Sequence, residues 1–273
     1  MGSTKELAAY LRYLQSEELA EGTIRIYLKE AESLTEYLSG REVTKDIMVE
    51  YKNRPALSNC SVTTRNLHIA AANRYLKYIS HGDCMIAALR VQRKQSLEDV
   101  LTIGEYRKLL QYAKESGREK YYMIMRTLAM TGIRVSELKY FTVETIKKPA
   151  ICVRNKQKTR EICISQKLRS ELEKYCRGNG ISVGIIFRGR NGEPISRIAV
   201  YKMLVRLADM AGIEKGKVHP HSLRHLFAVT YMEHYGNIFE LADLLGHSSL
   251  ETTRIYTRNT VRERGQKIDR LGL

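Results

Sequence analysis

The stretch His219-Pro-His-Ser-Leu-Arg-His225 is the most informative part of the sequence. The surrounding pattern predicts a helix that begins near Ser222 and stops at Gly236. His221 and Arg224 then lie three residues apart, on one face of the first turn of this helix. Alone, such a pair is more often a capping histidine and a solvated arginine, so its meaning depends on the residues around it.

Further along the chain, a histidine and a tyrosine follow at short distance. Leu245-Gly-His247 places His247 in the tight turn after the next predicted helix, and Tyr256 ends a last helix. On the N-terminal side, Thr131-Gly-Ile-Arg134 places Arg134 at a helix start, just after a glycine turn. Each position has an ordinary structural explanation, because a surface arginine or a capping histidine is common. The order of the residues carries the information.

Between these motifs the hydrophobic period changes from helical to extended. Ala150–Val153 and Glu161–Ile164 are short β-prone runs, and Asn155–Thr159 between them is typical of a hairpin loop. This loop carries Lys156 and Lys158, whose side chains point the same way in an extended arm. The other periodic segments are helical. The predicted fold class is therefore mainly α with a small antiparallel sheet (α+β).

The chain divides into two parts separated by a weakly patterned stretch. The first 80 residues are typical of four short helices, the last of which is expected to bury Leu67, Ala71, Tyr75 and Ile79. A capping-box spacing at Thr102-Ile-Gly-Glu105 opens a new domain. We therefore predict a helical domain (1–82), a basic interdomain linker (83–99), a mixed second domain (100–257) and a C-terminal tail (258–273).

The charge balance is strongly basic. The sequence has 46 Lys and Arg against 30 Asp and Glu, a formal net charge of +16. Residues 1–95 carry 14 basic and 11 acidic groups and residues 96–273 carry 32 and 19, so most of the excess lies in the second part. Two windows lack acidic residues, one between Glu50 and Asp83 and one from Thr145 to Arg160. A nucleic acid is the natural partner of such a chain, although charge alone does not separate DNA from RNA.

Other features exclude several classes of protein. There is no run of about 18 apolar residues and no secretion signal, so we expect a cytoplasmic protein with no membrane partner. The cysteines have wide, irregular spacing, which fits neither a paired metal motif nor a disulfide framework. They are Cys60, Cys84, Cys152, Cys163 and Cys176. We expect reduced thiols, no metal site and no cofactor.

The order of these residues resembles that of the tyrosine recombinase family. The order is Arg134, a hairpin lysine, the His-x-x-Arg pair at 221 and 224, and then His247 with Tyr256. That family includes the Xer recombinases and the phage and transposon integrases. The resemblance is specific from about residue 102 to residue 256 and covers the N-terminal helices in general pattern only. It implies a helical core-type DNA-binding domain, followed by a catalytic domain of the tyrosine recombinase type. It also implies DNA cleavage and rejoining through a 3′-phosphotyrosyl intermediate, without ATP or metal.

Phosphoryl-transfer chemistry agrees with the roles that the resemblance implies. Planar guanidinium groups suit the oxygens of a developing phosphorane better than ammonium groups do, so Arg134 and Arg224 would clamp the phosphate. His221 would be the general base or a proton shuttle. By the same resemblance, His247 would donate a hydrogen bond to the phosphate and Tyr256 would attack phosphorus. Lys156 would protonate the leaving oxygen, and Glu137 would orient the site. Lys158 is the alternative to Lys156.

The expected partners are double-stranded DNA and further copies of the chain. We expect the two domains to clamp the duplex from opposite sides, through phosphate contacts above all. Candidate DNA contacts are Arg65, Arg74, Lys77, Arg90, Arg93, Lys94, Lys158 and Arg160. The resemblance implies a tetrameric synapse on DNA. The tail would dock on a neighbouring protomer or remain a frayed basic end.

Several biological roles are compatible with these features. The first expectation is the integrase or transposase of a mobile element, and the alternative is a Xer-like resolver of chromosome or plasmid dimers. A type IB topoisomerase-like enzyme would share the residue types, but the His-x-x-Arg motif and the small first domain favour a recombinase. A DNA-binding regulator without chemistry, or a ribonucleoprotein component, would leave the set of reactive residues unexplained.

Overall fold

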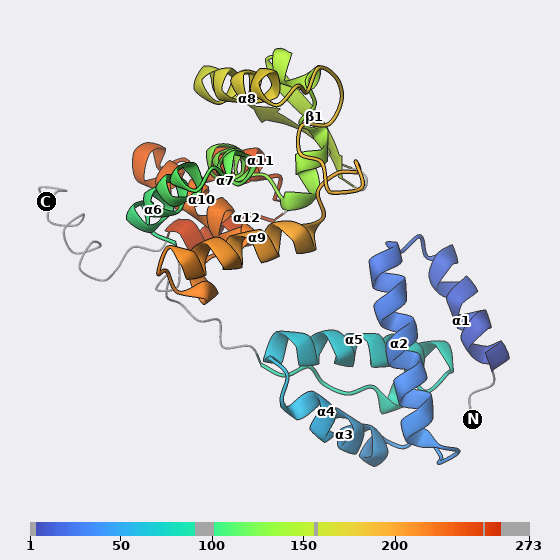
Figure 1. The fold of residues 1–273 in the computed structure, drawn as a ribbon. Coiled ribbons are helices and arrows are strands. Elements are labelled where there is room, and N and C mark those ends of the chain that lie inside the picture. Colours follow the sequence, from blue (N-terminus) through green and yellow to red (C-terminus); the bar gives the residue numbers. More distant parts are fainter. Residues whose placement is uncertain (1–3, 91–100, 156–157, 248, 258–273) are drawn as a thin grey trace, which may run out of the picture. The chain divides into compact units, whose positions relative to one another are not determined.

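The chain divides into two compact units, residues 1–94 and 95–273 (Figure 1). The computed structural model describes residues 4–90, 101–155, 158–247 and 249–257. Helices dominate both units, and the strands of the described residues form one two-stranded antiparallel sheet in the second unit. The fold class predicted from the sequence is confirmed.

The N-terminal unit is a bundle of helices around an aromatic-rich core. Its elements are α1 (Thr4–Ser16), α2 (Glu21–Leu38), α3 (Lys45–Asn53), α4 (Pro55–Ser58), α5 (Val62–Tyr78) and the 3-10 helix η1 (Gly82–Cys84). The helix beyond the four predicted ones is α4, a single turn that begins at the proline. The hydroxyl of Thr44 caps α3, and that of Ser61 caps α5. Tyrosine rings from α1 and α5 pack against one another: Tyr10, Tyr13, Tyr75 and Tyr78.

The buried face of α5 differs in part from the predicted one. Ala71 and Tyr75 are buried as expected, and Ile69 and Leu76 extend the buried surface around the helix. Leu67, however, is 43% exposed. It lies one turn before Ala71 on the same side of α5, where neighbouring helices no longer cover that side. The hydrophobic periodicity predicted which side of α5 is buried, but not how far along the helix the burial extends.

The segment that follows α5 packs on the N-terminal unit. Ile86 is buried in its core. The side-chain amide of Asn73 pairs with both backbone groups of Ile86, at 2.8 Å each. Asn66 pairs with Leu89 in the same way, at 2.7 and 2.9 Å. The first part of the predicted linker (83–99) is therefore held on α5 by amides that imitate strand pairing, a feature that the weak hydrophobic pattern of the segment did not reveal.

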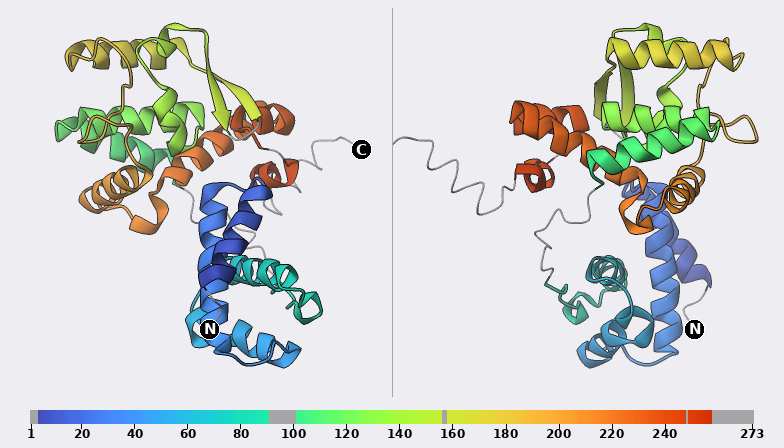
Figure 2. Two further views of the ribbon diagram at one scale, coloured as in Figure 1. Left: turned by 90° about the vertical axis from the view of Figure 1, so that its right-hand side faces the viewer. Right: turned by 60° about the vertical axis from the view of Figure 1, so that its left-hand side comes forward.

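The second unit consists of short helices and one hairpin. Its first elements are α6 (Ile103–Glu115), α7 (Glu119–Thr131), η2 (Val135–Tyr140), η3 (Thr145–Lys147), β1 (Ala150–Asn155) and β2 (Lys158–Cys163). The others are α8 (Gln166–Gly178), α9 (Arg197–Met210), η4 (Lys215–Lys217), α10 (Pro220–Tyr235), α11 (Ile238–Leu245), α12 (Leu250–Thr253) and η5 (Arg254–Thr257). Thr102 and Glu105 form the predicted capping box of α6. The helices α7 and α10 pack together in the middle, with α8 and the hairpin on one side and α9 on the other (Figures 1 and 2).

The hairpin is longer than the sequence predicted. Its register runs from Ala150 opposite Cys163 to Asn155 opposite Lys158. Asn155, Lys158 and Thr159, which we placed in the loop, thus belong to the strands. Backbone pairing needs no apolar side chain, so the ladder extends into polar sequence that hydrophobic patterning assigns to a turn. Lys156 lies outside the described residues.

No helix in the described ranges is long and apolar enough to cross a membrane. All five cysteines are free thiols, and two of them, Cys152 and Cys163, are exposed on the hairpin.

Candidate active site

The buried guanidinium of Arg224 is the centre of the candidate active site. Arg224 is 4% exposed and lies in α10. Its Nη1 donates to the carbonyl of Gly132 at 2.7 Å, and its Nη2 donates to that of Leu245 at 2.6 Å. One side chain therefore joins the end of α7 to the end of α11, and both ends lead directly into predicted site residues.

Both joined helix ends are glycine turns in which a side chain would not fit. Gly132 and Gly246 have φ values of 61° and 63°, the left-handed region that glycine adopts without strain. A Cβ on Gly132 would lie 2.4 Å from the ring of Phe227, and one on Gly246 would lie 2.5 Å from Arg160 Cδ. These turns bring Arg134 and His247 close to Arg224 because the backbone can reverse tightly there.

Glu137 holds two further arginines in this region. It is 2% exposed, accepts from the backbone N–H of Arg134 at 2.7 Å, and contacts the Nη1 of Arg134 at 3.4 Å. Its Oε2 accepts from Arg160 Nη2 at 2.6 Å. Arg134 Nη2 reaches the carbonyl of Gly246 at 3.4 Å. Glu137 thus orients Arg134 directly.

Arg160 differs from what the sequence suggested. We expected a DNA contact on the hairpin, but its side chain is 13% exposed and pairs with Glu137. Arg160 also donates through Nη1 to the carbonyl of Leu244. Arg160 therefore belongs to the interior of the site. A strand position is exposed only on one face of the sheet, and α11 covers the face that carries Arg160.

The electrostatics of the site favour an anion. Arg134 and Arg160 contact the buried carboxylate of Glu137, and Arg224 lies close enough to interact with its charge. Burial lowers the pKa of Arg224 to about 10, and the neighbouring Arg134 and Arg160 add to this effect. Since the protein supplies one carboxylate for several guanidinium groups, a bound anion such as a phosphodiester would balance the remaining positive charge.

His247 is fixed by the segment that follows α11. Its Nδ1 lies 2.8 Å from the hydroxyl of Thr253, a fully buried residue at the end of α12. Burial, with Arg224 second, lowers the pKa of His247 to about 4, so the ring is neutral at pH 7. With Nδ1 accepting from Thr253, Nε2–H remains to donate a hydrogen bond.

The hydroxyl of Tyr256 has a partner that the sequence did not suggest. Tyr256 is 8% exposed, and its Oη lies 2.5 Å from Nδ1 of His225. The two rings are 5.5 Å apart between centroids. Burial raises the pKa of Tyr256 to about 12, and the charge of Arg224 acts against this rise. His221, the residue we expected to serve this hydroxyl, lies on the exposed side of α10.

Comparison with known proteins explains the grouping of these side chains. Residues 99–263 match the phage integrase family. The chain is 31% identical to tyrosine recombinase XerA of Pyrococcus furiosus over 276 residues, which cover 98% of this chain and 94% of the relative. The chain belongs to the tyrosine recombinases. It is an enzyme that cleaves and rejoins DNA strands.

Solved structures are similar to the recombinase over nearly its whole length. One is XerH bound to its difH substrate, with a TM-score of 0.74, 18% identity, and 97% of this chain and 84% of that chain covered. Another is the Tn1549 transposon integrase in complex with transposon right end DNA, with a TM-score of 0.75, 17% identity and coverages of 98% and 99%. At these identities the likeness concerns the fold.

The other predicted contact residues of the recombinase have varied surroundings. Arg74 pairs with Glu17 and lies 5.3 Å from the centre of the Tyr13 ring, so it has partners inside its own unit. Lys77 and Arg90 are exposed and Arg65 is half-buried. Lys158 lies in β2, while Arg93 and Lys94 lie outside the described residues.

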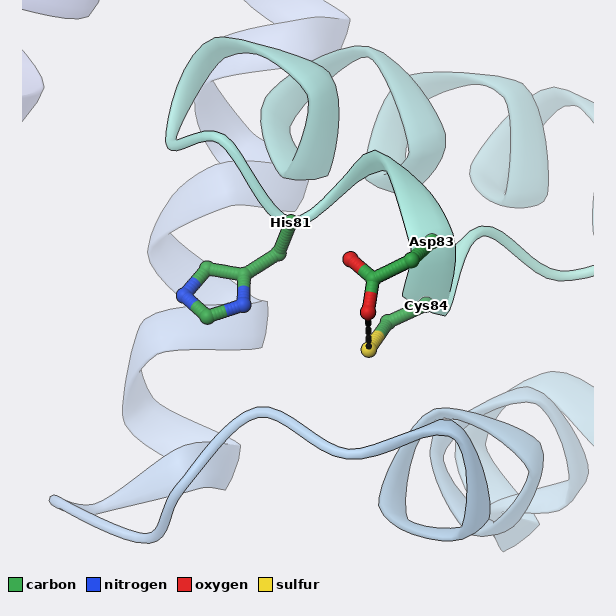
Figure 3. A group of neighbouring side chains, drawn as sticks. All are labelled: His81, Asp83 and Cys84. Atoms are coloured by element: carbon green, nitrogen blue, oxygen red, sulfur yellow. Dashed lines mark hydrogen bonds between the residues drawn. The ribbon is translucent and has the colours of Figure 1, made fainter.

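A group of potential metal ligands occurs in the N-terminal unit, in the turn after α5 (Figure 3). The ligand atoms of His81, Asp83 and Cys84 lie within 4.8 Å of one another. The thiol of Cys84 lies 3.6 Å from Asp83 Oδ2 and 3.6 Å from the carbonyl of Val43. These contacts satisfy the thiol within the protein, and the sequence analysis, which expected no metal, did not single out this group.

Proposed function

We propose that this recombinase exchanges DNA strands at specific sites, with Tyr256 as its nucleophile. The oxygen of Tyr256 attacks phosphorus, the bond from phosphorus to the 5′ oxygen breaks, and the DNA is left with a 3′-phosphotyrosyl link and a free 5′-hydroxyl. Rejoining reverses these steps without ATP, because the link conserves the energy of the phosphodiester. The observation that supports this most strongly is the placement of Tyr256 beside a cluster of three arginines and one carboxylate.

The phosphate would be held by guanidinium and imidazole groups. Arg134 and Arg224 present planar donors to the non-bridging oxygens, where negative charge grows in the transition state. His247 donates from Nε2, since Thr253 occupies Nδ1. Glu137 and Arg160 position Arg134 and the turn before His247. Removal of one such donor from an active site costs about 10²–10³-fold in rate.

The leaving 5′ oxygen needs a proton. Lys156, which lies between β1 and β2 in the sequence, is the proposed donor, and Lys158 is the alternative. A lysine on an extended arm can reach a phosphate that is bound beside Gly246, because α11 packs against β2. His221 is proposed as a further proton carrier on the exposed side of α10, where burial and Arg197 lower its pKa.

The partners in this proposal are double-stranded DNA and further copies of the chain. Both units are basic, and the exposed Lys77 and Arg90 can contact phosphates. The solved relatives XerH and Tn1549 integrase are bound to DNA, which supports a duplex as substrate. A tetrameric synapse, with the C-terminal tail docked on a neighbour, would bring two DNA sites together.

For the biological role we favour a Xer-like resolver of chromosome or plasmid dimers. The sequence alone had favoured a mobile-element integrase. Several curated relatives that match most of the chain bear Xer names, such as XerA of Pyrococcus furiosus and XerD of Halalkalibacterium halodurans at 28% identity. A plasmid with two directly repeated cognate sites separates the roles: a resolver converts it to two circles, whereas an integrase that requires two unlike sites leaves it unchanged.

The test of the chemistry uses a nicked duplex that contains the cognate site. This site is first isolated by retention of genomic fragments on immobilised Tyr256→Phe protein. The wild-type chain is expected to form a denaturation-resistant adduct on the 3′ side of the break, in EDTA and without ATP, and Tyr256→Phe to form none. A Tyr235→Phe variant is the matched control, because that tyrosine is the last residue of α10 and is 72% exposed.

If wild-type protein binds the verified site but forms no adduct, Tyr256 is not the nucleophile and a DNA-binding regulator becomes the better account. An adduct that persists in Tyr256→Phe would assign the nucleophile to another residue.

A further inference from the structure

The hydrogen bond between Tyr256 and His225 has no part in the residue roles proposed above. His225 follows Arg224 in α10, about 100° further around the helix. Arg224 points to the two glycine turns, whereas His225 points to η5 and places Nδ1 2.5 Å from the hydroxyl of Tyr256. Of these two neighbouring residues of one helix, Arg224 thus belongs to the proposed phosphate site and His225 contacts the proposed nucleophile.

The tyrosine ring is held so that its oxygen stays at the imidazole. Tyr256 packs in a small apolar cluster with Ala228, Leu241 and Leu245, and Ile255 and Phe227 line its edge. The ring therefore has little freedom, and its one polar atom is directed to His225. The charge of Arg224 also acts on this oxygen.

The charged groups around His225 keep it neutral. It is faced by His219, His221 and Arg224 from α10, by Tyr256 from η5 and by His247 from the turn after α11. Burial, followed by the charge interactions with His221, His219 and Arg224, lowers the pKa of His225 to about 4. A neutral imidazole with Nε2 protonated has a lone pair on Nδ1, so the hydroxyl of Tyr256 is the donor and His225 the acceptor.

We propose that His225 accepts the proton of Tyr256 as the tyrosine oxygen attacks phosphorus. This inference rests on the proposed function and reassigns the general base from His221 to His225. The O–H bond of Tyr256 breaks as a bond from oxygen to phosphorus forms, and Nδ1 takes the proton. In the reverse step, the imidazolium returns this proton to the tyrosine oxygen as the 5′-hydroxyl displaces it.

The low basicity of His225 in the free protein is compatible with this role. The phosphorane forms on the same oxygen that contacts Nδ1, so negative charge appears next to the imidazole when the proton moves. A neighbouring anion favours the protonated form and raises the pKa of the histidine at that moment. In the DNA-free protein the arrangement keeps both tyrosine and histidine neutral.

The experiment measures single-turnover adduct formation on the nicked duplex across a range of pH. The variants are His225→Gln and His225→Ala, with His221→Gln as the competing base. The matched control is His234→Gln, which replaces an exposed histidine at the end of the same helix, bonded to the Thr230 carbonyl. DNA binding and the thermal unfolding midpoint of each variant are recorded together with the rate.

Both His225 variants are expected to form the adduct about 100-fold more slowly than wild type at pH 7, the lower end of what general-base catalysis contributes. Their rates should rise about tenfold per pH unit above neutrality, because only the growing tyrosinate fraction reacts. The wild-type rate should change less. His234→Gln should match wild type.

Glutamine separates proton transfer from positioning, because its amide can accept a hydrogen bond but cannot take the proton. Wild-type rates in His225→Gln would overturn the proposal and leave His225 a positioning residue. A steep pH dependence in His221→Gln alone would return the role to His221. If the wild-type protein forms no adduct in the same assay, the proposed function itself is wrong. If the wild-type protein forms adducts and the His225 variants form them equally fast, only the role of His225 is refuted.

Discussion

Each unit of the recombinase buries one glutamate among basic side chains, and the two clusters differ in their balance of charge. Glu30 in the N-terminal unit is 3% exposed and contacts Arg54 at 3.1 Å, the hydroxyl of Tyr51 at 2.9 Å and His68 at 2.5 Å. The guanidinium of Arg54 also stacks 3.5 Å from the centre of the Tyr51 ring. One carboxylate thus meets one guanidinium, together with a tyrosine hydroxyl and an imidazole.

The Glu137 cluster has the same buried carboxylate but an excess of guanidinium groups. Arg134 and Arg160 contact Glu137 directly, and Arg224 lies close enough for its charge to act on them. A buried cluster whose positive and negative charges match is stable without a ligand. A buried cluster with surplus positive charge is stabilised by an anionic ligand, because an uncompensated buried charge is costly. The comparison suggests that surplus charge around a buried ion pair is a better sign of a binding site than burial itself.

Removing the carboxylates should show this difference most strongly. Glu30→Gln and Glu137→Gln each leave buried arginine charge without its partner, and each should lower the free energy of unfolding by about 3 kcal/mol or more. Millimolar inorganic phosphate should restore part of the loss in Glu137→Gln only, because phosphate can bind the three arginines. Urea unfolding followed by circular dichroism, with chloride at matched ionic strength as control, measures both effects.

Equal restoration of both variants by phosphate would mean that the anion acts on the whole protein. The distinction between the two clusters would then be lost.

The arginines of the two clusters should also respond differently to lysine. Lysine keeps the charge but cannot reach two carbonyls and a phosphate with one planar group. Arg224→Lys should therefore form the adduct about 10²–10³-fold more slowly. Arg54→Lys should leave the single-turnover rate of adduct formation at the wild-type level. A comparable loss in Arg54→Lys would show that the N-terminal cluster also supports the chemistry.

The glycine turn that Arg224 joins can be tested against a turn without that function. Gly132 and Gly117 both have positive φ, 61° and 66°, and alanine should cost each about 1–2 kcal/mol for that reason. Alanine at Gly132 also meets Phe227 at 2.4 Å, whereas nothing lies within 4 Å at Gly117. We expect Gly132→Ala to lose roughly a further 1–3 kcal/mol of unfolding free energy. Chemical denaturation of both variants gives the difference, and equal losses would show that Phe227 moves aside freely.

A separate expected effect is on the pH dependence of stability. Burial holds the pKa values of His225 and His247 at about 4, below the ordinary value of 6.5. Between these values the unfolded chain binds more protons than the folded chain, so stability should be complete above pH 6.5 and fall as pH decreases toward 4. The double variant His225→Gln with His247→Gln should show a shallower decline. Unfolding midpoints measured from pH 7 to pH 4 test this, and an unchanged slope would contradict it.

Local signals in the sequence predicted much of this architecture. The caps at Thr44 and Thr102 and the glycine stops at Gly132 and Gly236 depend on backbone geometry within one turn, which a short stretch of sequence determines. Glu137 lies next to Arg134 in the sequence, so its orienting contact could be expected as well. The family resemblance supplied the remaining members of the site.

The sequence did not predict features that depend on which faces meet in space. His225 was missed because the position beside Arg224 has no meaning until η5 packs against that side of α10. Arg160 was taken for a surface residue because α11 covers its strand only in the folded unit. Ile86 and Leu89 lack any periodic pattern, and they are fixed by side-chain amides from another element. Each case involves contacts between residues far apart in the chain.

The contact between Thr253 and His247 links two parts of the proposed site. Tyr256 lies three residues beyond Thr253, so the segment that carries the proposed nucleophile also fixes the ring expected to contact the phosphate. If this segment swings out, the tyrosine and the orientation of His247 are lost together. Under the proposed mechanism, a protomer with a displaced segment would be inactive until the segment returns, because two groups of the site leave in one movement.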